Sequence, residues 1–339
     1  MLRRFPAYYH EFRCLAGSCP KSCCIGWEVE IDDDTAAAYT GISGALGEEL
    51  RAHLTADADG ALCFPLEGAR CPFLDSDDLC RIHRELGQEL TSVTCREHPR
   101  FTEDFGPLQE ISLSASCPEA ARLLLAGREP LTFCEEALPG DNEESDPWLE
   151  PLLTVRDTAM QILSDTSRPI RQRMARILAL ALSAQMLLDE ERIEDLDALC
   201  REEIHVPEVS VAGVFPDFWD ALSELEILEQ DWLPLLDSAR DSSHHLPEIT
   251  LERLTEYFLF RWLLKAINDG DLLGRMQLSI ASALTVERLA GRTVTPEEAL
   301  YRYCREIEHC EENIDSLLET FRWDERFSPE RFLSELQNV

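Results

Sequence analysis

The sequence predicts a mainly α protein in two parts: a small irregular cysteine-rich domain that holds a metal or an iron–sulfur cluster, then an all-α domain. Ten of the 13 cysteines lie before residue 135. A stretch rich in Pro, Gly and acids, LPGDNEESDP, follows them, and nearly every later segment carries apolar residues at helical spacing. We therefore place the cysteine-rich domain at 1–137, a linker at 138–147 and the all-α domain at 148–339.

Structured segments before the linker are expected to be short, because Pro, Gly and Asp interrupt them. Residues 27–34 alternate apolar and acidic side chains, which predicts a half-exposed strand or an extended arm. Short helices are expected at 32–42 and 44–54, a turn at 74–78 that leads into a helix, and a further helix at 116–127. A region with so little continuous core needs a bound metal to hold it together.

The segments after the linker have the periodicity of packed helices, and we expect seven or eight of them. The apolar stripe of 171–188 comprises Met174, Ile177, Leu178, Ala181, Leu182 and Met186. Residues 249–267 are apolar nearly all round, which predicts a buried helix. Residues 295–321 open with Thr295 as N-cap, Pro296 and Glu298, the pattern of a capping box, and are expected to form one helix.

The charge and the compartment limit the classes of function. A net charge of −35, from 66 acidic and 31 basic residues, argues against nucleic acid and against an anionic membrane surface as partners. It is compatible with simple solubility or with attraction of a basic protein substrate. We find neither a secretory signal nor an apolar run long enough to span a membrane. In the reducing cytoplasm that we therefore expect, clustered cysteines indicate metal binding or catalysis rather than disulfides.

Eight cysteines form the candidate metal site: Cys14, Cys19, Cys23, Cys24, Cys71, Cys80, Cys95 and Cys117. Several stand in predicted turns or at helix starts, where backbone N–H groups stabilise a thiolate. Thiolates select zinc, copper(I) or iron–sulfur clusters, and eight of them could form two four-cysteine sites or one cluster with spare thiols. Adjacent Cys23 and Cys24 point in different directions, so at most one should join a given site, and we favour Cys23. The alternative is a set of buried apolar cysteines.

The segments that carry these cysteines resemble the flagellin lysine-N-methylase family of bacteria. They are CLAGSCPKSCCIGWEVEID, CPFLDSDDLCRIHRELG, TCREHPR and LSASCPEAARLLL, and the cysteine-rich half is similar to the broader group of zinc- or iron-chelating cysteine-cluster proteins. Further on, YFLFRWLLKAINDGDLLGR and CREIEHCEEN resemble the family's helical half.

The resemblance implies a cytoplasmic enzyme that transfers methyl groups from S-adenosylmethionine to flagellin lysines and binds a four-iron, four-sulfur (4Fe-4S) cluster, with zinc as the alternative metal. By the same match, the eight cysteines are the ones to carry over, whereas Cys63 and Cys134 have no counterpart. His83 and His98 stand where the family usually has an aromatic residue, and each is either a nitrogen ligand or a packing residue.

Residues for methyl transfer are expected in the helical half. The chain has no glycine pattern for nucleotide binding, and it lacks the C-x₃-C-x₂-C triplet of radical enzymes because Gly26 stands at the third position. Glu306, His309 and Asn313 follow one another at i, i+3 and i+7. Glu306 or His309 could accept the lysine proton and Asn313 could orient either. The alternative is a hydrogen-bonded set packed on the cysteine domain.

Arg261, within the predicted buried helix, needs an anionic partner. That partner is either a protein carboxylate or the carboxylate of a bound amino-acid-like ligand, in which case Arg261 would be a cofactor-binding residue. If no methyl transfer occurs, the remaining function class is a non-catalytic iron–sulfur or zinc module for sensing, electron transfer or partner binding.

Overall fold

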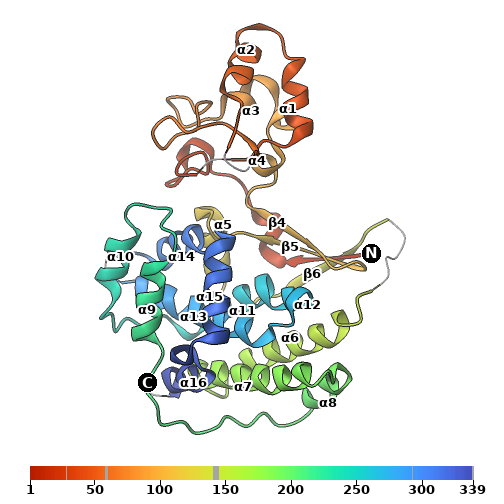
Figure 1. Cartoon of the computed structure of the whole chain (residues 1–339), viewed down its shortest axis with the longest axis vertical. Coiled ribbons are helices and arrows are strands. Elements are labelled where there is room, and N and C mark those ends of the chain that lie inside the picture. Colours follow the sequence, from red (N-terminus) through yellow and green to blue (C-terminus); the bar gives the residue numbers. More distant parts are fainter. Residues whose placement is uncertain (28, 58–59, 140–144, 292, 338–339) are drawn as a thin grey trace.

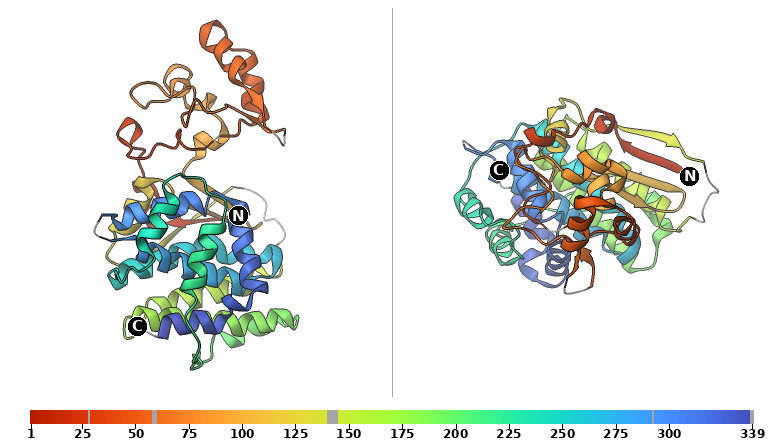
Figure 2. Two further views of the ribbon diagram at one scale, coloured as in Figure 1. Left: turned by 60° about the vertical axis from the view of Figure 1, so that its left-hand side comes forward. Right: turned by 90° about the horizontal axis from the view of Figure 1, so that it is seen from above.

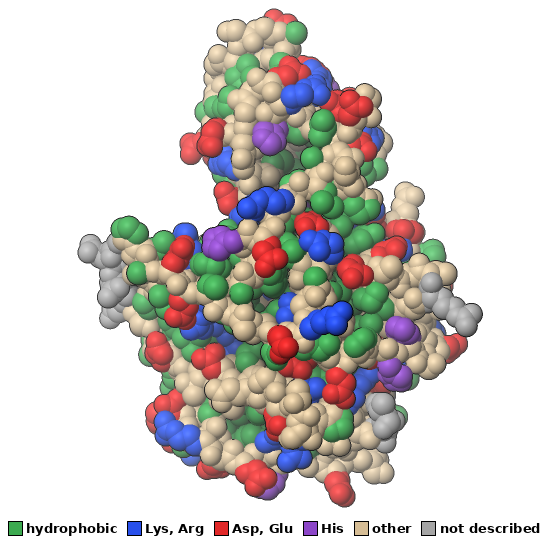
Figure 3. Space-filling view, turned by 180° about the vertical axis from the view of Figure 1, so that it is seen from behind, with side chains coloured by type: hydrophobic (Ala, Val, Ile, Leu, Met, Phe, Trp, Pro, Cys, Tyr) green, Lys and Arg blue, Asp and Glu red, His purple; other side chains and the backbone are tan. Residues whose placement is uncertain are grey.

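The computed structural model describes residues 1–27, 29–57, 60–139, 145–291 and 293–337. Its elements form a small lobe that projects from one end of a larger helical body (Figures 1 and 2). We call residues 14–97 the cysteine lobe and the remainder the helical body. The molecule narrows where the two meet, as the reverse face also shows (Figure 3).

The cysteine lobe has a small core of its own. It contains the helices α1 (Asp33–Thr40), α2 (Gly44–His53), α3 (Arg81–Leu86) and α4 (Val93–Glu97), with a two-stranded hairpin of β2 (Thr55–Ala56) and β3 (Leu62–Cys63). Its core residues are Ile31, Ala36, Tyr39, Leu50, Phe64, Phe73 and Ile82. The helices expected at 32–42, 44–54 and after 74–78 are confirmed. The described part of 27–34 is an extended arm with one bridge, between Glu30 and Cys63, that ends at the N-cap Asp32.

A four-stranded sheet, which the sequence analysis did not predict, lies in the body at the end next to the lobe. Its strands are β1 (Leu2–Pro6), β4 (Arg100–Asp104), β5 (Leu108–Leu113) and β6 (Phe133–Ala137), in the order β4-β5-β1-β6. β1 pairs in parallel with β5 and antiparallel with β6. Apolar and polar residues do not alternate regularly along these strands, because the strands also carry charged side chains that form ion pairs within the fold. Buried Glu110 of β5, for example, accepts two hydrogen bonds from Arg156 (2.5 and 2.7 Å).

The helices of the body surround a large apolar core. The first is α5 (Pro118–Ala126), and the others are α6 (Leu149–Leu163), α7 (Ile170–Asp189), α8 (Leu196–Leu199), α9 (Phe215–Glu224), α10 (Trp232–Ala239), α11 (Glu248–Trp262), α12 (Ala266–Asp269), α13 (Leu272–Leu289), α14 (Pro296–Glu306), α15 (Glu311–Trp323) and α16 (Pro329–Gln337). Helices α11 and α13 are buried along nearly all of their length, as expected for α11. None of the described helices is both long and apolar enough to cross a bilayer.

The boundary between the two apolar cores does not lie at the predicted linker. Tyr8, Phe12, Leu108 and Ala121 belong to the large core of the body, although all lie within the predicted cysteine domain. The chain enters the lobe after β1 and returns from it into β4, so the lobe is an insertion between strands of one sheet. Within the predicted linker, residues 140–144 lie outside the described residues.

Three expectations for the helical half were wrong in detail. In the described residues after 144 there are eleven α-helices, α6–α16, instead of seven or eight, because short helices such as α8 and α12 have little periodicity to read. Met186 is 59% exposed rather than part of the buried stripe. The helix expected at 295–321 is interrupted between Glu306 and Glu311, although Thr295 caps its start by accepting the Glu298 N–H (3.2 Å).

Candidate functional site

Four cysteines line a common cavity in the cysteine lobe. Cys24, Cys71, Cys80 and Cys95 surround a space of about 30 Å³ whose remaining wall is mainly apolar and aromatic, including Tyr39. Within the described part of the chain, no three Cys, His, Asp or Glu side chains converge closely enough to hold one metal ion. The donor set itself, four thiols on the wall of one largely apolar cavity, has the chemistry of a soft-metal centre.

Local backbone contacts position these four thiols. The Cys71 N–H donates to the Cys24 carbonyl (2.9 Å), which fixes two distant segments side by side. Cys80 is the N-cap of α3, and its Sγ accepts the His83 N–H (3.5 Å). The Cys95 N–H donates to Oγ of Ser92, the N-cap of α4 (3.1 Å). The expectation that cysteines stand in turns and at helix starts is therefore confirmed for this group.

A second group of cysteines adjoins the first. The thiols of Cys14, Cys19 and Cys117 are near enough to influence one another electrostatically, and Cys117 is the N-cap of α5 in the body. Burial raises the pKa of Cys19 and raises the pKa of Cys117 to about 11. The eight cysteines thus form two adjoining groups, with Cys23 between them because it interacts with both Cys14 and Cys24.

The structure places Cys24, rather than the favoured Cys23, on the cavity. The hydrogen bond between the two side chains lowers the pKa of the Cys24 thiol to about 7 and raises that of Cys23. Cys24 faces inward because its carbonyl is held by Cys71 and because the next residue, Ile25, forms a bridge with Arg70. Neither Cys63 nor Cys134 lines this cavity.

Aromatic and basic side chains fill the junction between the lobe and the body. The Trp27 ring stacks on His309, with centroids 5.1 Å apart, and the Arg305 guanidinium lies 3.7 Å from the Trp27 centroid. Nε2 of His309 also bonds Oγ of Ser116 (2.7 Å). Burial lowers the pKa of His309 and lowers that of His98 to about 3, so both are neutral near pH 7.

The two histidines of the cysteine-rich segments do not lie on the cavity wall. His98 packs beside Trp27, with ring centroids 6.3 Å apart, and His83 lies exposed on α3. The placement of His98 fits the packing alternative, whereas exposed His83 neither packs in a core nor lines the cavity.

In the predicted polar trio, the Asn313 amide donates to the Glu306 carbonyl (2.9 Å), and His309 stands apart from both. The Glu306 carboxylate accepts the N–H groups of Leu228 (2.9 Å) and Glu229 (2.6 Å), and Asn313 bonds both backbone groups of Glu226 (2.9 Å each). These two residues hold the 226–229 loop, whereas His309 faces the junction with the lobe because the helix breaks between them. Glu306 and Asn313 thus form a hydrogen-bonded set with a loop of the body rather than with the cysteine domain. Burial raises the pKa of Glu306 to about 7.

Known proteins share part of this sequence. Over 139 residues the chain is 28% identical to a lysine-N-methylase from Salmonella choleraesuis (strain SC-B67), an alignment that covers 39% of this chain and 35% of that protein. The chain is similar to lysine-N-methylases. A lysine-N-methylase from Salmonella typhimurium (strain LT2) matches at 28% over 144 residues, again covering 39% of the chain and 35% of the relative.

A flagellum-related protein also matches. The flagellar biosynthetic protein FliU from Salmonella muenchen is 28% identical over 142 residues, which are 39% of this chain and 81% of that protein. The chain therefore spans about a third of the length of the two curated lysine-N-methylases that it matches. No protein-family model and no solved structure matches it. The resemblance drawn from the cysteine motifs is thus confirmed at the level of similarity.

In this lysine-N-methylase-like chain, Arg261 has a protein partner. Its Nε donates to Glu308 (2.6 Å), which also accepts the Tyr257 hydroxyl (2.7 Å) and the Ser114 hydroxyl (2.7 Å). All four side chains are buried. The sequence analysis did not identify Glu308 as the partner of Arg261. A buried guanidinium needs a carboxylate, and this requirement was the signal that pointed to a nearby buried Glu.

Proposed function

We propose that this protein is an S-adenosylmethionine-dependent N-methyltransferase that acts on lysine side chains of flagellin in the cytoplasm and binds an iron–sulfur cluster. The similarity to lysine-N-methylases and to a flagellar protein carries the proposal. The four thiols around one cavity support the cluster. The alternative is a non-catalytic iron–sulfur or zinc module.

Cys24, Cys71, Cys80 and Cys95 are the residues that would hold a 4Fe-4S cluster, since four thiolates are its usual ligands. Burial raises the pKa of Cys71 to about 12 and that of Cys95 to about 11, so loading must release their protons to solvent. When bound, the cluster supplies a covalent tie among four chain segments that share only a small core. We assign it this structural role.

Methyl transfer itself needs only aligned reactants. A neutral lysine amine attacks the methyl carbon of the sulfonium in line, so that the new N–C bond forms as the S–C bond breaks and S-adenosylhomocysteine leaves. A base must take one proton from the lysine ammonium. This chain must therefore offer a place for a lysine side chain beside a group that titrates near neutral pH.

Glu306 lies at such a place. It lines a cavity of about 90 Å³ together with Lys21, whose Nζ forms an ion pair with Glu229 (2.6 Å). Lys21 is part of the wall of this cavity, which also carries the carboxylates of Glu229, Asp231 and Glu298. A carboxylate with a pKa of about 7 is suited to accept a proton from a lysine ammonium. We propose this cavity as the site of the substrate lysine and Glu306 as its base.

The proposal is tested by anaerobic purification, analysis of iron and acid-labile sulfide, and incubation with labelled S-adenosylmethionine and flagellin. We expect about four irons and four sulfides per chain and label on flagellin lysines. Replacing Glu306 by Gln should abolish labelling at a retained iron content, whereas Glu312→Gln, on the exposed face of α15, should not.

Two outcomes would contradict the proposal in different ways. An intact cluster with no methyl incorporation would leave the non-catalytic module. Zinc in place of iron would reject the cluster and leave the enzyme standing.

A further inference from the structure

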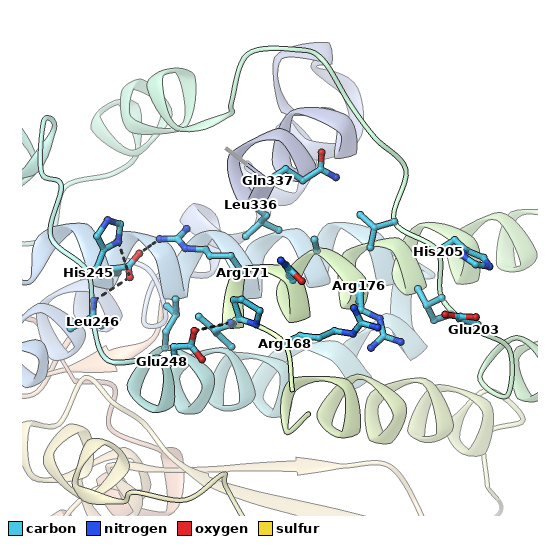
Figure 4. Close-up of a pocket in the computed structure, with 18 residues that line it drawn as sticks. Arg168, Arg171, Arg176, Glu203, His205, His245, Leu246, Glu248, Leu336 and Gln337 are labelled. Atoms are coloured by element: carbon cyan, nitrogen blue, oxygen red, sulfur yellow. Dashed lines mark hydrogen bonds and ion pairs between the residues drawn. The ribbon is translucent and has the colours of Figure 1, made fainter. Parts of the chain in front are cut away.

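One short segment of the cysteine lobe, residues 21–27, contributes to both candidate sites. Cys24 and Trp27 line the cysteine cavity, and Lys21 lines the lysine cavity beside Glu306. The two cavities share no lining residue, so this segment connects them. A larger cavity, of about 660 Å³, lies at the far end of the body between α7, the segments 203–206 and 245–248, and the end of α16, and no residue of 21–27 lines it (Figures 1 and 4).

The segment has few contacts that would hold it in place by themselves. All seven residues are partly buried, and none of them belongs to either apolar core of the described chain. The backbone is bonded to a neighbouring turn of the lobe: the Gly26 N–H donates to the Ala69 carbonyl (2.9 Å), and the Cys71 N–H donates to the Cys24 carbonyl (2.9 Å). The conformation of 21–27 therefore depends on the cysteine cavity on one side and on the body on the other.

The side chain of Arg305 fastens this segment to the body. Its Nη2 donates to the Ile25 carbonyl (2.7 Å), its guanidinium lies 3.7 Å from the Trp27 centroid, and its Nε donates to Glu229 (2.8 Å). The Arg305 side chain is 1% exposed, so these charge-assisted contacts are shielded from solvent. Gly26 permits the close approach, because a Cβ there would lie 3.0 Å from Nη2 of Arg305.

Glu229 connects Arg305 to the proposed base. Its carboxylate also accepts a hydrogen bond from Nζ of Lys21 (2.6 Å), and its backbone N–H donates to the Glu306 carboxylate (2.6 Å). Burial acts to raise the pKa of Glu229, but the hydrogen bonds from Lys21 and Arg305 hold that pKa below its ordinary value, so the carboxylate is charged near pH 7. A continuous set of contacts thus runs from Trp27, on the wall of the cysteine cavity, through Arg305 and Glu229 to Glu306.

We propose that occupancy of the cysteine cavity controls the lysine cavity, with Arg305 as the positioning residue that couples them. A metal or cluster bound through Cys24 holds the following residues in the conformation that receives Arg305, which keeps Lys21 and Glu229 in the wall beside Glu306. Without the metal, the segment is free to leave Arg305, and the lysine cavity loses part of its wall. This inference rests on the proposed function and adds to it a dependence of substrate binding on iron.

The test compares the affinity of a lysine-bearing peptide for the loaded and the metal-free protein. The full chain is purified anaerobically, one portion is stripped with a chelator, and the Kd of a fluorescent flagellin peptide with a single lysine is measured by anisotropy. Coupling between two sites typically changes affinity about 5- to 150-fold, so the metal-free protein should bind at least about fivefold more weakly. A peptide with norleucine in place of the lysine should show no such difference.

Arg305→Gln separates coupling from a merely structural role. The variant should bind the peptide equally in its loaded and metal-free forms, whereas a general loss of stability would weaken binding in both forms and leave their ratio unchanged. Arg302→Gln is the matched control. This neighbouring arginine of α14 also lines the lysine cavity, but its ion pairs are with Asp231 (2.5 Å) and Glu298 (3.4 Å) of the body, so the ratio should persist.

Two glycines of the lobe provide a second matched pair. Gly26→Ala places a methyl group against Arg305 and Glu229 and should reduce the dependence on metal. Gly68→Ala also puts Ala at a positive φ (+68°, compared with +103° at Gly26), but a Cβ there has no described atom within 4 Å, so the dependence should persist. Thermal unfolding and iron content verify that each variant folds and loads.

The outcomes separate this inference from the proposed function. Equal peptide affinity of the loaded and metal-free wild type would overturn the inference and leave the methyltransferase proposal standing. A metal dependence that persists in Arg305→Gln would also overturn it, because Arg305 would not be the coupling residue. The expected dependence without methyl transfer from S-adenosylmethionine would support the inference and reject the enzyme. If neither form binds the peptide, the lysine cavity is not a substrate site and both proposals fail.

Discussion

Replacing Glu308 by Gln tests the buried network that joins α11 to the segment before α5. The substitution keeps the shape of the side chain but removes the charge that faces Arg261. The nearest remaining carboxylate belongs to Glu103, 3.8 Å from the guanidinium, and the Phe101 ring lies 4.1 Å from it. The variant thus leaves a buried cation with a distant partner.

The expected cost follows from this geometry. Breaking a buried ion pair by removing one partner costs about 3–5 kcal/mol, and the Gln amide oxygen retains one acceptor, so we expect about 3 kcal/mol. With an unfolding entropy of about 2.1 cal/mol/K per residue, the 339 residues give about 0.7 kcal/mol/K, and the Tm should fall by about 4 °C.

The cost should depend on pH in a defined direction. Burial acts to raise the pKa of the Glu308 carboxyl, but the neighbouring Arg261 holds that pKa below its ordinary value. The folded-state pKa is thus below the unfolded-state pKa, and the stabilisation is present at neutral pH and lost as the pH falls through the folded-state pKa. The difference between wild type and variant should therefore shrink in acid.

Calorimetry or urea unfolding measures the effect, with Glu312→Gln on α15 as an exposed control. A double variant, Arg261→Met with Glu308→Leu, removes both charges and should recover part of the stability that Glu308→Gln loses. A variant within about 1 kcal/mol of the wild type at pH 7 would refute the reasoning, because it would mean that the Arg261 charge does not depend on Glu308.

Three further predictions concern the lobe and its junction. Cys24→Ser should lower the bound iron and sulfide, whereas Cys134→Ser on β6 should not, and equal metal content in both would remove Cys24 from the ligand set. Burial raises the Glu306 pKa from 4.5 to about 7, so the folded state binds its proton more tightly than the unfolded state does. Stability should fall as the pH rises through this window, and the Gln variant should lose that slope in urea midpoints at pH 5 and 8. Trp27→Ala removes the ring that Arg305 covers, which should lower the free energy of unfolding by about 0.5–2 kcal/mol. Proteolysis between the lobe and the body should then be faster, and an unchanged cleavage rate would argue against a stabilising role of this contact.

The sequence alone determined the features that depend on neighbouring residues. The buried character of α11, the cap at Thr295 and the short helices of the lobe follow from periodicity and capping within a few residues. The density of cysteines in the first third of the chain predicts a soft-metal region, and this stays a prediction.

Only the tertiary structure decided the features that join distant residues. The sheet pairs β1 with β5, more than 100 residues apart. Its charged strands lack the regular alternation of apolar and polar residues by which a strand is predicted from sequence. The inward face of Cys24 depends on a bond to Cys71. The break between α14 and α15 places Glu308 against Arg261, and the cavity of about 660 Å³ forms only where α7 meets the segments 203–206 and 245–248 and the end of α16. Such contacts are selected by packing and charge across the whole fold, so residues near in sequence do not reveal them.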